Sequence, residues 1–417
     1  MTVFRRVQVP EAPQFDFLRE QLDCGDLIIN DGKTDVIDAG HLTLFPGLID
    51  PHVHFRTPGQ EYKEDWRTAS RATLRGGYTT VFDMPNNQPA CIDVERLKAK
   101  RALINQQLQE AGLPIHYELY LGADKNHLDQ ISEVRRDIIG VKVFMGSSTG
   151  DLLMDDDSSL HAVFSVAAHL QLTVGIHAED ESMIRARTAQ YAGETSYSVH
   201  SIIRSPEVAA AAIRKVISLV KLYGTSVYIL HVSSIEELTL IREAKAAGLP
   251  VYAETSPHHL FLNTTCYASL HGKAQMNPPL REPQHQPALF KAIHDGTIDT
   301  VGSDHAPHTQ DEKSRPYGQC PSGVPGIETN LPLLLNAYHA GHLTLAEILK
   351  LTYTRIQTIF NYKSNNDFIL IDLQKEKVVR DQDLRTKCGW SPYAGQRLKG
   401  WPTYGIVNQT VYDLEQL

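Results

Sequence analysis

Cysteine is scarce in this chain of 417 residues, and nothing in the sequence pairs it. The five cysteines are odd in number, lie far apart and form no CxxC pair. Scattered single cysteines are typical of reduced thiols, whereas a disulfide framework shows an even and closely spaced set. We therefore expect free thiols and a cytoplasmic location.

Long apolar runs and long basic runs are also missing. No apolar stretch approaches the roughly 18 residues that a membrane-spanning helix needs, and the start of the chain lacks the apolar core of a signal peptide. The 40 Lys and Arg are outnumbered by 49 Asp and Glu, which gives a net charge of -9. A mildly acidic chain without basic clusters argues against nucleic acid or an anionic membrane as a partner.

The rest of the composition is that of an ordinary globular protein. Charged residues make up 21% of the chain and apolar residues 42%, so the chain can bury a core. Its length allows one large domain plus an accessory piece. Histidine is the unusual count, because the 19 histidines outnumber Met, Cys and Trp together. Their positions decide whether that count has a meaning.

Short apolar or β-branched runs recur along the middle of the chain, each followed by a polar cluster and a helical pattern. Such runs are typical of strands buried on both faces. Eight are predicted as strands: Leu48–Phe55, Thr79–Met84, His116–Gly122, Val141–Met145, Thr173–His177, Val227–His231, Val251–Thr255 and Thr300–Ser303. Eight strand–helix repeats predict an α/β fold, a parallel (β/α)8 barrel of the TIM type. The alternative, a doubly wound open sheet, needs a glycine-rich phosphate turn that residues 55–59 (FRTPG) do not supply.

Two helices have clear boundary signals. Ser205 and Pro206 supply a cap residue and a proline at the first helical position, and the Ala-rich pattern that follows ends at Gly224. Ser234 and Glu237 have the spacing of a capping box, in which each side chain bonds the backbone of the other. Both helices fall between predicted strands, as the barrel requires.

The two ends of the chain differ from its middle. Residues 1–45 hold short strand-like pieces separated by Gly and Asp turns, and residues 366–417 have the same character. We expect both ends to meet in a small accessory β-sandwich beside the barrel, which itself spans residues 46–365. The predicted organisation is one barrel domain with an accessory β subdomain built from both termini.

Residues of metal-binding type stand at several predicted strand ends, and chemistry in such a barrel takes place at the carboxyl ends of its strands. His52 and His54 end the first strand two residues apart, so strand alternation puts them on one face. His177, His231 and Asp304 stand at three further strand ends. Taken singly, an HxH pair is more often chance, and a lone histidine is more often a hydrogen-bonded core residue. Their joint occurrence favours a metal site.

Lys142 stands inside the fourth predicted strand, where an unpaired ammonium group is costly to bury. Four imidazoles and one carboxylate exceed the three protein ligands of a single open zinc site, so they suit two metals that share a bridge. A bridging ligand is an oxygen anion, and lysine becomes one if its amine reacts with CO2 to form a carbamate. The carbamate would also resolve the buried charge.

Several motifs resemble those of a known family. Residues 45–56 (FPGLIDPHVHFR) resemble the opening of the amidohydrolase superfamily. Further stretches are similar to its dihydroorotase branch, the type with a barrel and a sandwich. They are DMPN at 83–86, GVKVF at 140–144, SPHHL at 256–260, MNPPLR at 276–281, SDHAPHT at 303–309 and KCGWSP at 387–392. The resemblance extends over most of the chain.

The resemblance implies a binuclear zinc centre, bridged by carboxylated Lys142 and a hydroxide. The implied protein ligands are His52, His54, Lys142, His177, His231 and Asp304. In some relatives an Asp of the following loop takes the bridging role, and here Asp151 and Asp155–Asp157 follow Lys142. That alternative stays open, as does the metal itself, because Mn and Co tolerate similar ligands.

The resemblance also implies a substrate-binding set. Arg56, Asn86 and His308 are similar to residues that bind the α-carboxylate of the substrate, and Asn277 is similar to a residue that contacts its ring. The forked guanidinium of Arg56 suits a carboxylate on chemical grounds as well. A surface salt bridge is the plainer interpretation of that arginine. Residues 321–326 (PSGVPG) resemble the loop that closes beside the substrate.

The implied activity is the reversible hydrolysis of the cyclic amide of dihydroorotate to N-carbamoyl-aspartate, a step of pyrimidine biosynthesis. The zinc-held hydroxide would attack the amide carbonyl, and Asp304 would act first as general base and then as general acid. The substrate is then a small molecule. A homodimer is expected by analogy with the family.

Two other functions stay open at this point. Allantoinase and dihydropyrimidinase belong to the same superfamily and share its metal ligands, but Arg56 and His308 favour a substrate that carries a carboxylate. The second is a non-catalytic barrel that associates with a transcarbamoylase, as some dihydroorotase-like chains do after losing metal ligands. The intact ligand set argues against it.

Overall fold

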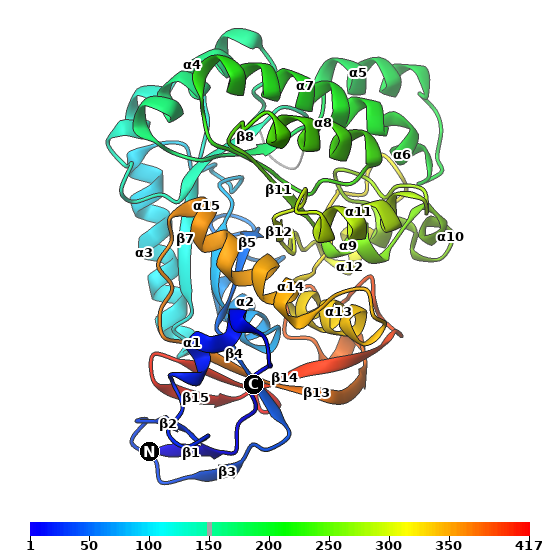
Figure 1. Cartoon of the computed structure of the whole chain (residues 1–417). Coiled ribbons are helices and arrows are strands. Elements are labelled where there is room, and N and C mark those ends of the chain that lie inside the picture. Colours follow the sequence, from blue (N-terminus) through cyan, green and yellow to red (C-terminus); the bar gives the residue numbers. More distant parts are fainter. Residues whose placement is uncertain (148–151) are drawn as a thin grey trace.

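A barrel of eight parallel strands forms the centre of this computed structural model, which describes residues 1–147 and 152–417. The strands lie side by side in chain order from β5 to β12, and a parallel bridge between Val53 and His305 brings the two edges of the sheet together (Figure 1). They are β5 (Leu48–Val53), β6 (Tyr78–Asp83), β7 (His116–Gly122), β8 (Gly140–Phe144), β9 (Val174–His177), β10 (Val227–Ile229), β11 (Val251–Thr255) and β12 (Thr300–Val301). The predicted barrel is confirmed, with strand ends shifted by a few residues.

The barrel strands have no polar face, which is why they appear in the sequence as continuous runs. Every residue of β5, β6, β8 and β9 is buried, because the inner face of each strand packs in the barrel and the outer face packs against helices. The same burial makes the few charged residues within these strands conspicuous.

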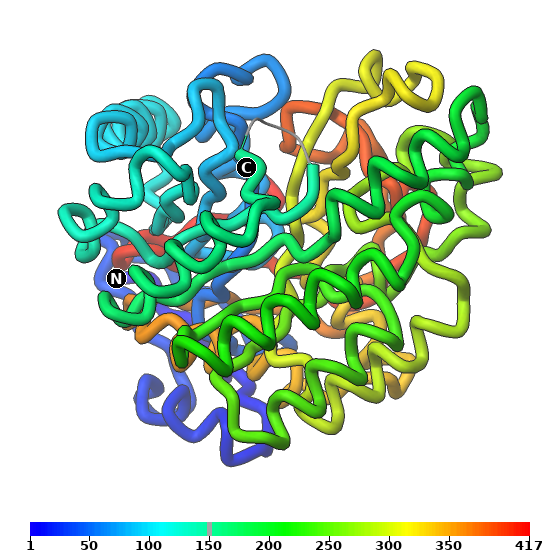
Figure 2. The backbone as a smooth tube through the Cα atoms, turned by 90° about the horizontal axis from the view of Figure 1, so that it is seen from above, coloured from blue at the N-terminus to red at the C-terminus, as the bar shows by residue number. Residues whose placement is uncertain are grey.

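Helices surround the barrel and follow the strands in chain order. Figure 2 shows α4, α7 and α8 lying side by side, and each contacts the next. The main helices are α2 (Trp66–Arg75), α3 (Val94–Ala111), α4 (Asp157–Leu170), α5 (Glu181–Gln190), α6 (Val199–Ile203), α7 (Pro206–Tyr223), α8 (Ile235–Ala246), α9 (Pro257–Phe261), α11 (His285–His294), α13 (Ile327–His339), α14 (Leu345–Leu349) and α15 (Arg355–Phe360). Shorter helical turns are η1 (Pro13–Phe15), α1 (Asp16–Arg19), η2 (Leu128–Ser132), η3 (Thr264–Cys266), α10 (Tyr267–Leu270), η4 (His271–Ala274), α12 (Gln310–Lys313), η5 (Lys350–Thr354) and η6 (Asp381–Asp383).

The two helices with boundary signals begin where the sequence predicts, but one detail is wrong. α7 starts at Pro206 and ends before Gly224, which takes the left-handed conformation of a C-cap. Ser234 caps α8 by accepting from the backbone N–H of Glu237. Glu237 does not complete the capping box, because its carboxylate instead accepts from the backbone and hydroxyl of Ser233.

Both chain termini lie beside one end of the barrel, as predicted, but they form two sheets. A four-stranded sheet has the order β15-β14-β13-β4, so the chain's early strand β4 pairs with strands from its last fifty residues. A separate three-stranded sheet has the order β2-β1-β3 and comes from the N-terminus alone (Figure 1). Their bounds are β1 (Thr2–Arg5), β2 (Leu27–Ile29), β3 (Val36–Asp38), β4 (Leu42–Pro46), β13 (Phe368–Val378), β14 (Arg397–Val407) and β15 (Thr410–Asp413). The exact domain boundaries at residues 45 and 366 stay a prediction.

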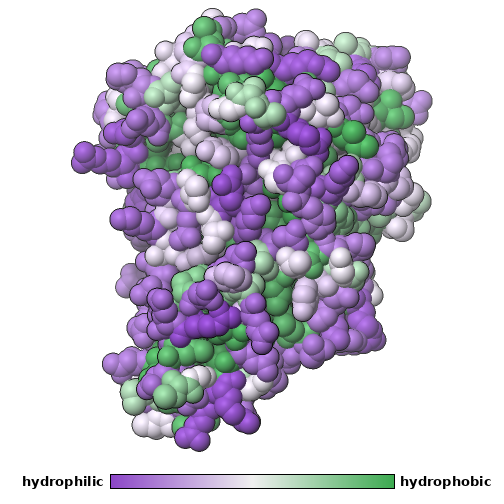
Figure 3. Space-filling view, in the orientation of Figure 1, coloured by the Kyte–Doolittle hydropathy of each residue, from purple (hydrophilic) through white to green (hydrophobic). Residues whose placement is uncertain are grey.

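The surface visible in Figure 3 is mostly hydrophilic, with hydrophobic atoms interspersed between charged and polar side chains. Among the described helices, none combines the length and the apolar character that crossing a bilayer would require.

Candidate active site

One pocket opens at the carboxyl ends of the barrel strands, and every predicted site residue except His308 lines it. The lining residues are His52, His54, Arg56, Asn86, Lys142, Phe144, His177, His231, Asn277, Asp304, Ala306, Ser322 and Gly323. Residues from β5, β8, β9 and the segments that follow β10 and β12 therefore converge from distant parts of the chain. The functional roles assigned to these residues from the sequence stay predictions.

Three ligand-type atoms meet at one side of the pocket. His52 Nε2 lies 3.2 Å from His54 Nε2, and Asp304 Oδ1 lies 3.2 Å from each of them. Three such atoms at this spacing match the edges of a coordination tetrahedron with metal–ligand distances of about 2.0 Å, the value for zinc and imidazole nitrogen. All three residues are buried. This group can hold one metal ion without rearrangement.

A second pair of nitrogens meets nearby. His177 Nδ1 lies 3.0 Å from His231 Nε2, and both residues are buried. Lys142 interacts electrostatically with both groups, since its charge acts on Asp304 as well as on His177 and His231. The lysine lines the same pocket as both sets of ligand-type atoms, which a bridging role requires.

Lys142 is 1% exposed, and its ammonium makes no hydrogen bond or ion pair with any described residue. Its Nζ lies 4.5 Å from the centre of the Phe144 ring. Burial lowers the pKa of Lys142 to about 7, because desolvation disfavours the charged form. A large share of this side chain is thus a neutral amine near neutral pH, which is the form that reacts with CO2.

The imidazoles are held in the tautomers that metal binding needs. His52 Nδ1 lies 2.8 Å from Glu254 Oε1, and His177 Nε2 lies 2.8 Å from Glu179 Oε2. A carboxylate accepts the proton of one ring nitrogen, so the other nitrogen turns its lone pair into the pocket. Burial also lowers the pKa of His54, to about 3, which keeps that ring neutral.

The two supporting carboxylates were missed in the sequence, although one had a signal. Glu254 lies within the strand β11, where burying a carboxylate costs free energy, as burying the lysine in β8 does. A charged residue at such a position therefore indicates a partner or a function. Glu179 follows His177 by two residues and carries no such signal, because it lies beyond the end of β9. Its partner Arg204, at 2.8 Å, comes from the distant end of α6.

Arg56 is a buried cation without an anion. It is 2% exposed, its Nε donates to the Pro307 carbonyl at 3.1 Å, and its Nη1 has no partner. Among the described residues no carboxylate oxygen lies within 4.0 Å of the guanidinium. Burial lowers the pKa of Arg56 to about 10, and the group stays charged at neutral pH.

Strand alternation was expected to put His54 on one face with His52, but His54 and Arg56 are oriented by the backbone after the strand. β5 ends at Val53, so His54 and Arg56 lie beyond the strand and its alternation does not orient them. Instead Arg56 takes a left-handed backbone conformation with φ of 62°. His231 and Asp304 are left-handed too, with φ of 41° and 45°. Such conformations are costly for residues other than glycine and cluster at functional sites.

Asn86 and Asn277 both reach the pocket, each with a histidine as neighbour. Asn86 Oδ1 lies 2.7 Å from His54 Nδ1, so Asn86 also orients a predicted metal ligand. Asn277 Oδ1 lies 2.8 Å from His200 Nε2, a contact from α6 that the sequence did not indicate. This hydrogen bond fixes the orientation of the Asn277 amide.

His308 lies behind the pocket wall. The ring is 0% exposed; its Nδ1 lies 3.0 Å from Lys63 Nζ, and its Nε2 lies 3.0 Å from the Ser322 carbonyl. The lysine can only donate, so Nδ1 accepts from it. The other ring nitrogen, Nε2, also lies 3.2 Å from Arg56 Nη2, so His308 contacts the guanidinium that lines the pocket. Burial and the neighbouring charge of Arg56 lower the pKa of His308 well below its usual value. In this arrangement the neutral ring supports the 321–326 loop.

The 321–326 loop forms part of the pocket wall. Ser322 and Gly323 line the pocket, Gly323 N donates to the Gln275 carbonyl at 3.0 Å, and Gly326 N donates to His305 Nδ1 at 3.1 Å. Gly323 has φ of 136°, and a Cβ there would lie 2.5 Å from the Ala306 carbonyl oxygen. Glycine is therefore required at this position.

The alternative bridging carboxylates were also located. Asp155, Asp156 and Asp157 are exposed, and each has a local partner: Arg185 at 3.2 Å, the N-terminus of α4, and Lys215 at 2.8 Å. None of them lines the pocket. Asp151 lies outside the described residues. Within the described part of the chain, Lys142 is the candidate bridge.

Comparisons with known proteins identify the family of the chain. The model of the amidohydrolase family matches residues 43–353. A dihydroorotase of Halobacterium salinarum is 33% identical over 394 residues, which cover 92% of this chain and 89% of the relative. A dihydroorotase of Methanosarcina mazei is 34% identical over 382 residues, which cover 86% and 81%.

Solved structures share the fold. An L-hydantoinase (dihydropyrimidinase) from Arthrobacter aurescens has a TM-score of 0.88 at 24% identity, over 98% of this chain and 95% of that one. A dihydropyrimidinase from Brevibacillus agri has a TM-score of 0.80 at 26% identity, over 92% and 87%. The first likeness shows the fold alone. On the family match and the similarity to the two dihydroorotases, the chain belongs to the amidohydrolase family.

Proposed function

We propose that this chain is a zinc-dependent dihydroorotase, which reversibly hydrolyses the cyclic amide of dihydroorotate to N-carbamoyl-aspartate in pyrimidine biosynthesis. The observation that carries the proposal is Arg56, a buried guanidinium that lines the pocket and has an unpaired Nη1. Dihydroorotate has a carboxylate, which hydantoin and dihydrouracil lack. A desolvated, forked cation is the group that recognises a carboxylate.

Two zinc ions fit the ligand set. His52, His54 and Asp304 would hold one ion, and His177 and His231 would hold the other, with the carbamate of Lys142 between them. The convergent imidazoles and their carboxylate partners support this assignment. When bound, the ions supply a water of lowered pKa and polarise the amide carbonyl.

Asp304 is proposed to move the proton. It is the one acidic residue among the described residues that line the pocket. In hydrolysis, the oxygen of water bonds to the carbonyl carbon and the ring C–N bond breaks. Asp304 accepts a proton from the water and delivers it to the leaving ring nitrogen, so atoms and charge balance. Arg56 holds the substrate carboxylate, and Asn277 contacts the ring.

Steady-state kinetics with matched substrates test the proposal. The purified protein, supplied with zinc and bicarbonate, is assayed with dihydroorotate, dihydrouracil, hydantoin and allantoin. A charge-assisted hydrogen bond is worth about 1.5–3 kcal/mol, so kcat/KM for dihydroorotate should exceed that for dihydrouracil by about 10- to 100-fold. Turnover of dihydrouracil, hydantoin or allantoin without turnover of dihydroorotate would overturn the proposal.

Metal analysis separates an enzyme from a scaffold. An active centre of the proposed kind holds about two zinc ions per chain. Less than one zinc per chain, together with no activity after zinc and bicarbonate are added, would favour a non-catalytic partner of a transcarbamoylase.

A further inference from the structure

A segment of the C-terminal region crosses to the pocket side of the barrel. Residues 384–391, here called the strap, follow η6 and precede β14, and they contain most of the KCGWSP motif. The proposed reaction assigns this motif no role. Its backbone and side chains nevertheless contact three segments that border the pocket: the one after Arg56, the one after Asp304, and the start of α13.

Two buried carboxylates hold the strap by its backbone. Glu328, 7% exposed in the first turn of α13, accepts from Arg385 N at 2.8 Å and from Thr386 N at 2.9 Å. Glu64, 0% exposed, accepts from Lys387 N at 3.1 Å and from the Thr386 hydroxyl. Three successive amides of the strap thus bind carboxylates from two segments of the barrel domain. Because these backbone N–H groups are taken from water, the carboxyl oxygens that accept from them fix the path of the strap.

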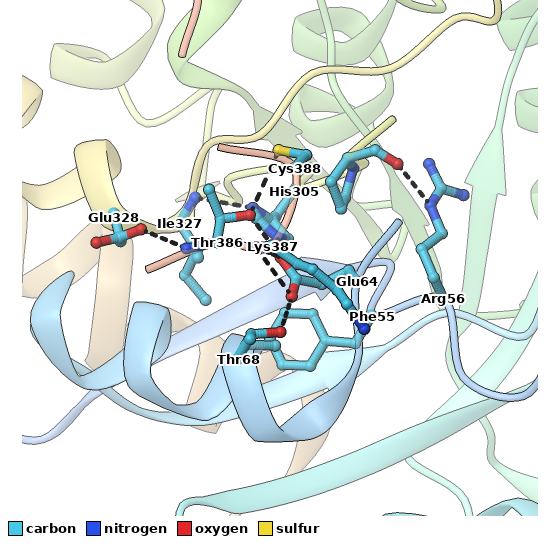
Figure 4. Close-up of polar contacts among 12 residues, drawn as sticks. Phe55, Arg56, Glu64, Thr68, His305, Ile327, Glu328, Thr386, Lys387 and Cys388 are labelled. Atoms are coloured by element: carbon cyan, nitrogen blue, oxygen red, sulfur yellow. Dashed lines mark hydrogen bonds and ion pairs between the residues drawn. The ribbon is translucent and has the colours of Figure 1, made fainter. Parts of the chain in front are cut away.

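Glu64 connects the strap to the residue beside Asp304. Figure 4 shows Glu64 between Thr386, Thr68 and His305. His305 Nε2 lies 3.4 Å from Glu64 Oε2, and His305 Nδ1 accepts from Gly326 N at 3.1 Å, at the end of the 321–326 loop. Since Nδ1 accepts, the ring proton is on Nε2, facing the carboxylate. His305 is 0% exposed, and its Nε2 forms no hydrogen bond with any described residue, so it meets Glu64 through the 3.4 Å electrostatic contact alone.

Trp390 connects the strap to Arg56. The indole Nε1 donates to the His308 carbonyl at 2.7 Å, and the preceding Pro307 carbonyl accepts from Arg56 Nε at 3.1 Å. Trp390 is fully buried, so its ring has no freedom to leave this contact. Lys387 adds a bond to Asp65 at 2.7 Å, nine residues after Arg56. The strap therefore holds the residue next to the carbonyl that orients the guanidinium, and it also holds the segment that follows Arg56.

We propose that the strap positions Arg56 for the substrate carboxylate, with Trp390 acting through the 307–308 backbone and Thr386 acting through Glu64, which lies in the segment that follows Arg56. The inference rests on the proposed function. None of these residues lines the pocket, so they act on the substrate through Arg56. Disturbing the strap should weaken binding of dihydroorotate and leave the metal ligands, and hence the chemical step, in place.

Two matched threonines test this role. Thr386 and Thr68 both donate a hydroxyl to Glu64, but Thr386 belongs to the strap and Thr68 to α2. Thr386→Val should raise KM for dihydroorotate about 5- to 10-fold with kcat within about twofold, the signature of lost binding energy. Thr68→Val should leave KM within about twofold. Trp390→Phe, which removes the indole donor, should raise KM like Thr386→Val. Zinc content should be the same in all variants.

The results separate the strap from the reaction. Unchanged KM in both Thr386→Val and Trp390→Phe, or equal KM changes in the two threonine variants, would overturn the strap proposal. If the wild-type protein does not turn over dihydroorotate, the proposed function fails. Amide hydrogen exchange of residues 304–308 then still tests whether the strap holds this backbone segment in place. Faster exchange in Thr386→Val than in Thr68→Val supports positioning, and equal exchange in the two variants contradicts it.

Discussion

Two lysines, Lys100 on α3 and Lys142 in β8, are buried to the same 1% exposure, but their surroundings differ. Lys100 Nζ contacts Asp83 at 2.6 Å, the Met84 carbonyl at 2.8 Å and Asn87 Oδ1 at 2.7 Å. These acceptors use all three protons of the ammonium group. Lys142 has no such acceptor among the described residues and faces the ring of Phe144. Lys100 therefore has its polar partners within the protein, whereas Lys142 lacks them among the described residues.

Charged residues that line the pocket differ in the same way from those packed behind it, here called the shell. In the shell, Glu179 pairs with Arg204, and Asp83 pairs with Lys100. In the pocket, the guanidinium of Arg56 and the amine of Lys142 have no carboxylate partner among the described residues. Because burying an unpaired charge costs free energy, such groups persist where a ligand or a modification supplies the partner. Buried charge alone therefore does not mark a site, whereas buried charge without a partner does.

The largest effect should follow loss of the amine that becomes the bridge. Lys142→Ala removes a shared ligand, and loss of several kcal/mol of metal-based stabilisation lowers kcat/KM by about a thousandfold or more. Acetate or propionate should restore part of the activity, because a small carboxylate can occupy the space of the carbamate. Activity of the variant is measured with and without the acid. Unchanged activity would move the bridge to an Asp of the following loop.

Lys100→Met should act on stability instead. Removing one partner of a buried ion pair costs about 3–5 kcal/mol, since Asp83 is left without its cation. The free energy of unfolding is measured by urea titration, with exposed Lys98→Met on the same helix as the control. Carboxylic acids should restore nothing. A Lys100 variant with normal stability, or one rescued by acetate, would erase the difference between the two lysines.

Arg56→Gln should raise KM for dihydroorotate by about 10- to 100-fold, because one charge-assisted contact to the substrate carboxylate is lost. Zinc content should stay the same, since Arg56 is not among the ligands. Inhibition by dicarboxylates that resemble the product should weaken in parallel. If KM does not change, the unpaired guanidinium serves another purpose than substrate binding.

The smallest effect concerns Glu328, a buried acid that can lose its charge by protonation. Burial raises the pKa of Glu328 to about 7, above its value in an unfolded chain. The folded protein thus keeps this proton where the unfolded chain has released it, and the associated stability is lost as pH rises toward and past 7. Glu328→Gln does not titrate and keeps an oxygen for Arg385 N and Thr386 N. The urea midpoint of Glu328→Gln minus that of the wild type should be larger at pH 8 than at pH 5. A pH-independent difference between the two proteins would contradict the assigned pKa.

The barrel and its ligand-type residues could be predicted because burial leaves a mark in sequence. A strand buried on both faces has an apolar run, and Lys142 stands out within one. Lys100 had no such mark, because Lys98 and Lys100 look alike in a helical pattern and only the tertiary contact with Asp83 separates them. Arg56 was identified, but its left-handed backbone conformation was not.

Contacts between distant segments could not be predicted, because a tertiary contact leaves no local pattern in the sequence. Nothing local indicates that Trp390 bonds the carbonyl of His308, or that Glu64 meets Thr386 across more than three hundred residues. The strand order of the accessory subdomain was likewise not predicted: β1 pairs with β2 and β3, and β4 joins the C-terminal strands.

Detection of a carbamate at Lys142 tests the central claim most directly, that the unpaired lysine is completed by CO2. The protein is incubated with zinc and 13C-bicarbonate and observed by 13C NMR, together with Lys142→Ala and Lys100→Met. We expect one carbamate signal in the wild-type protein and in Lys100→Met, and none in Lys142→Ala. A wild-type protein that is active and fully loaded with zinc but shows no carbamate signal, or a signal that persists in Lys142→Ala, would contradict the claim.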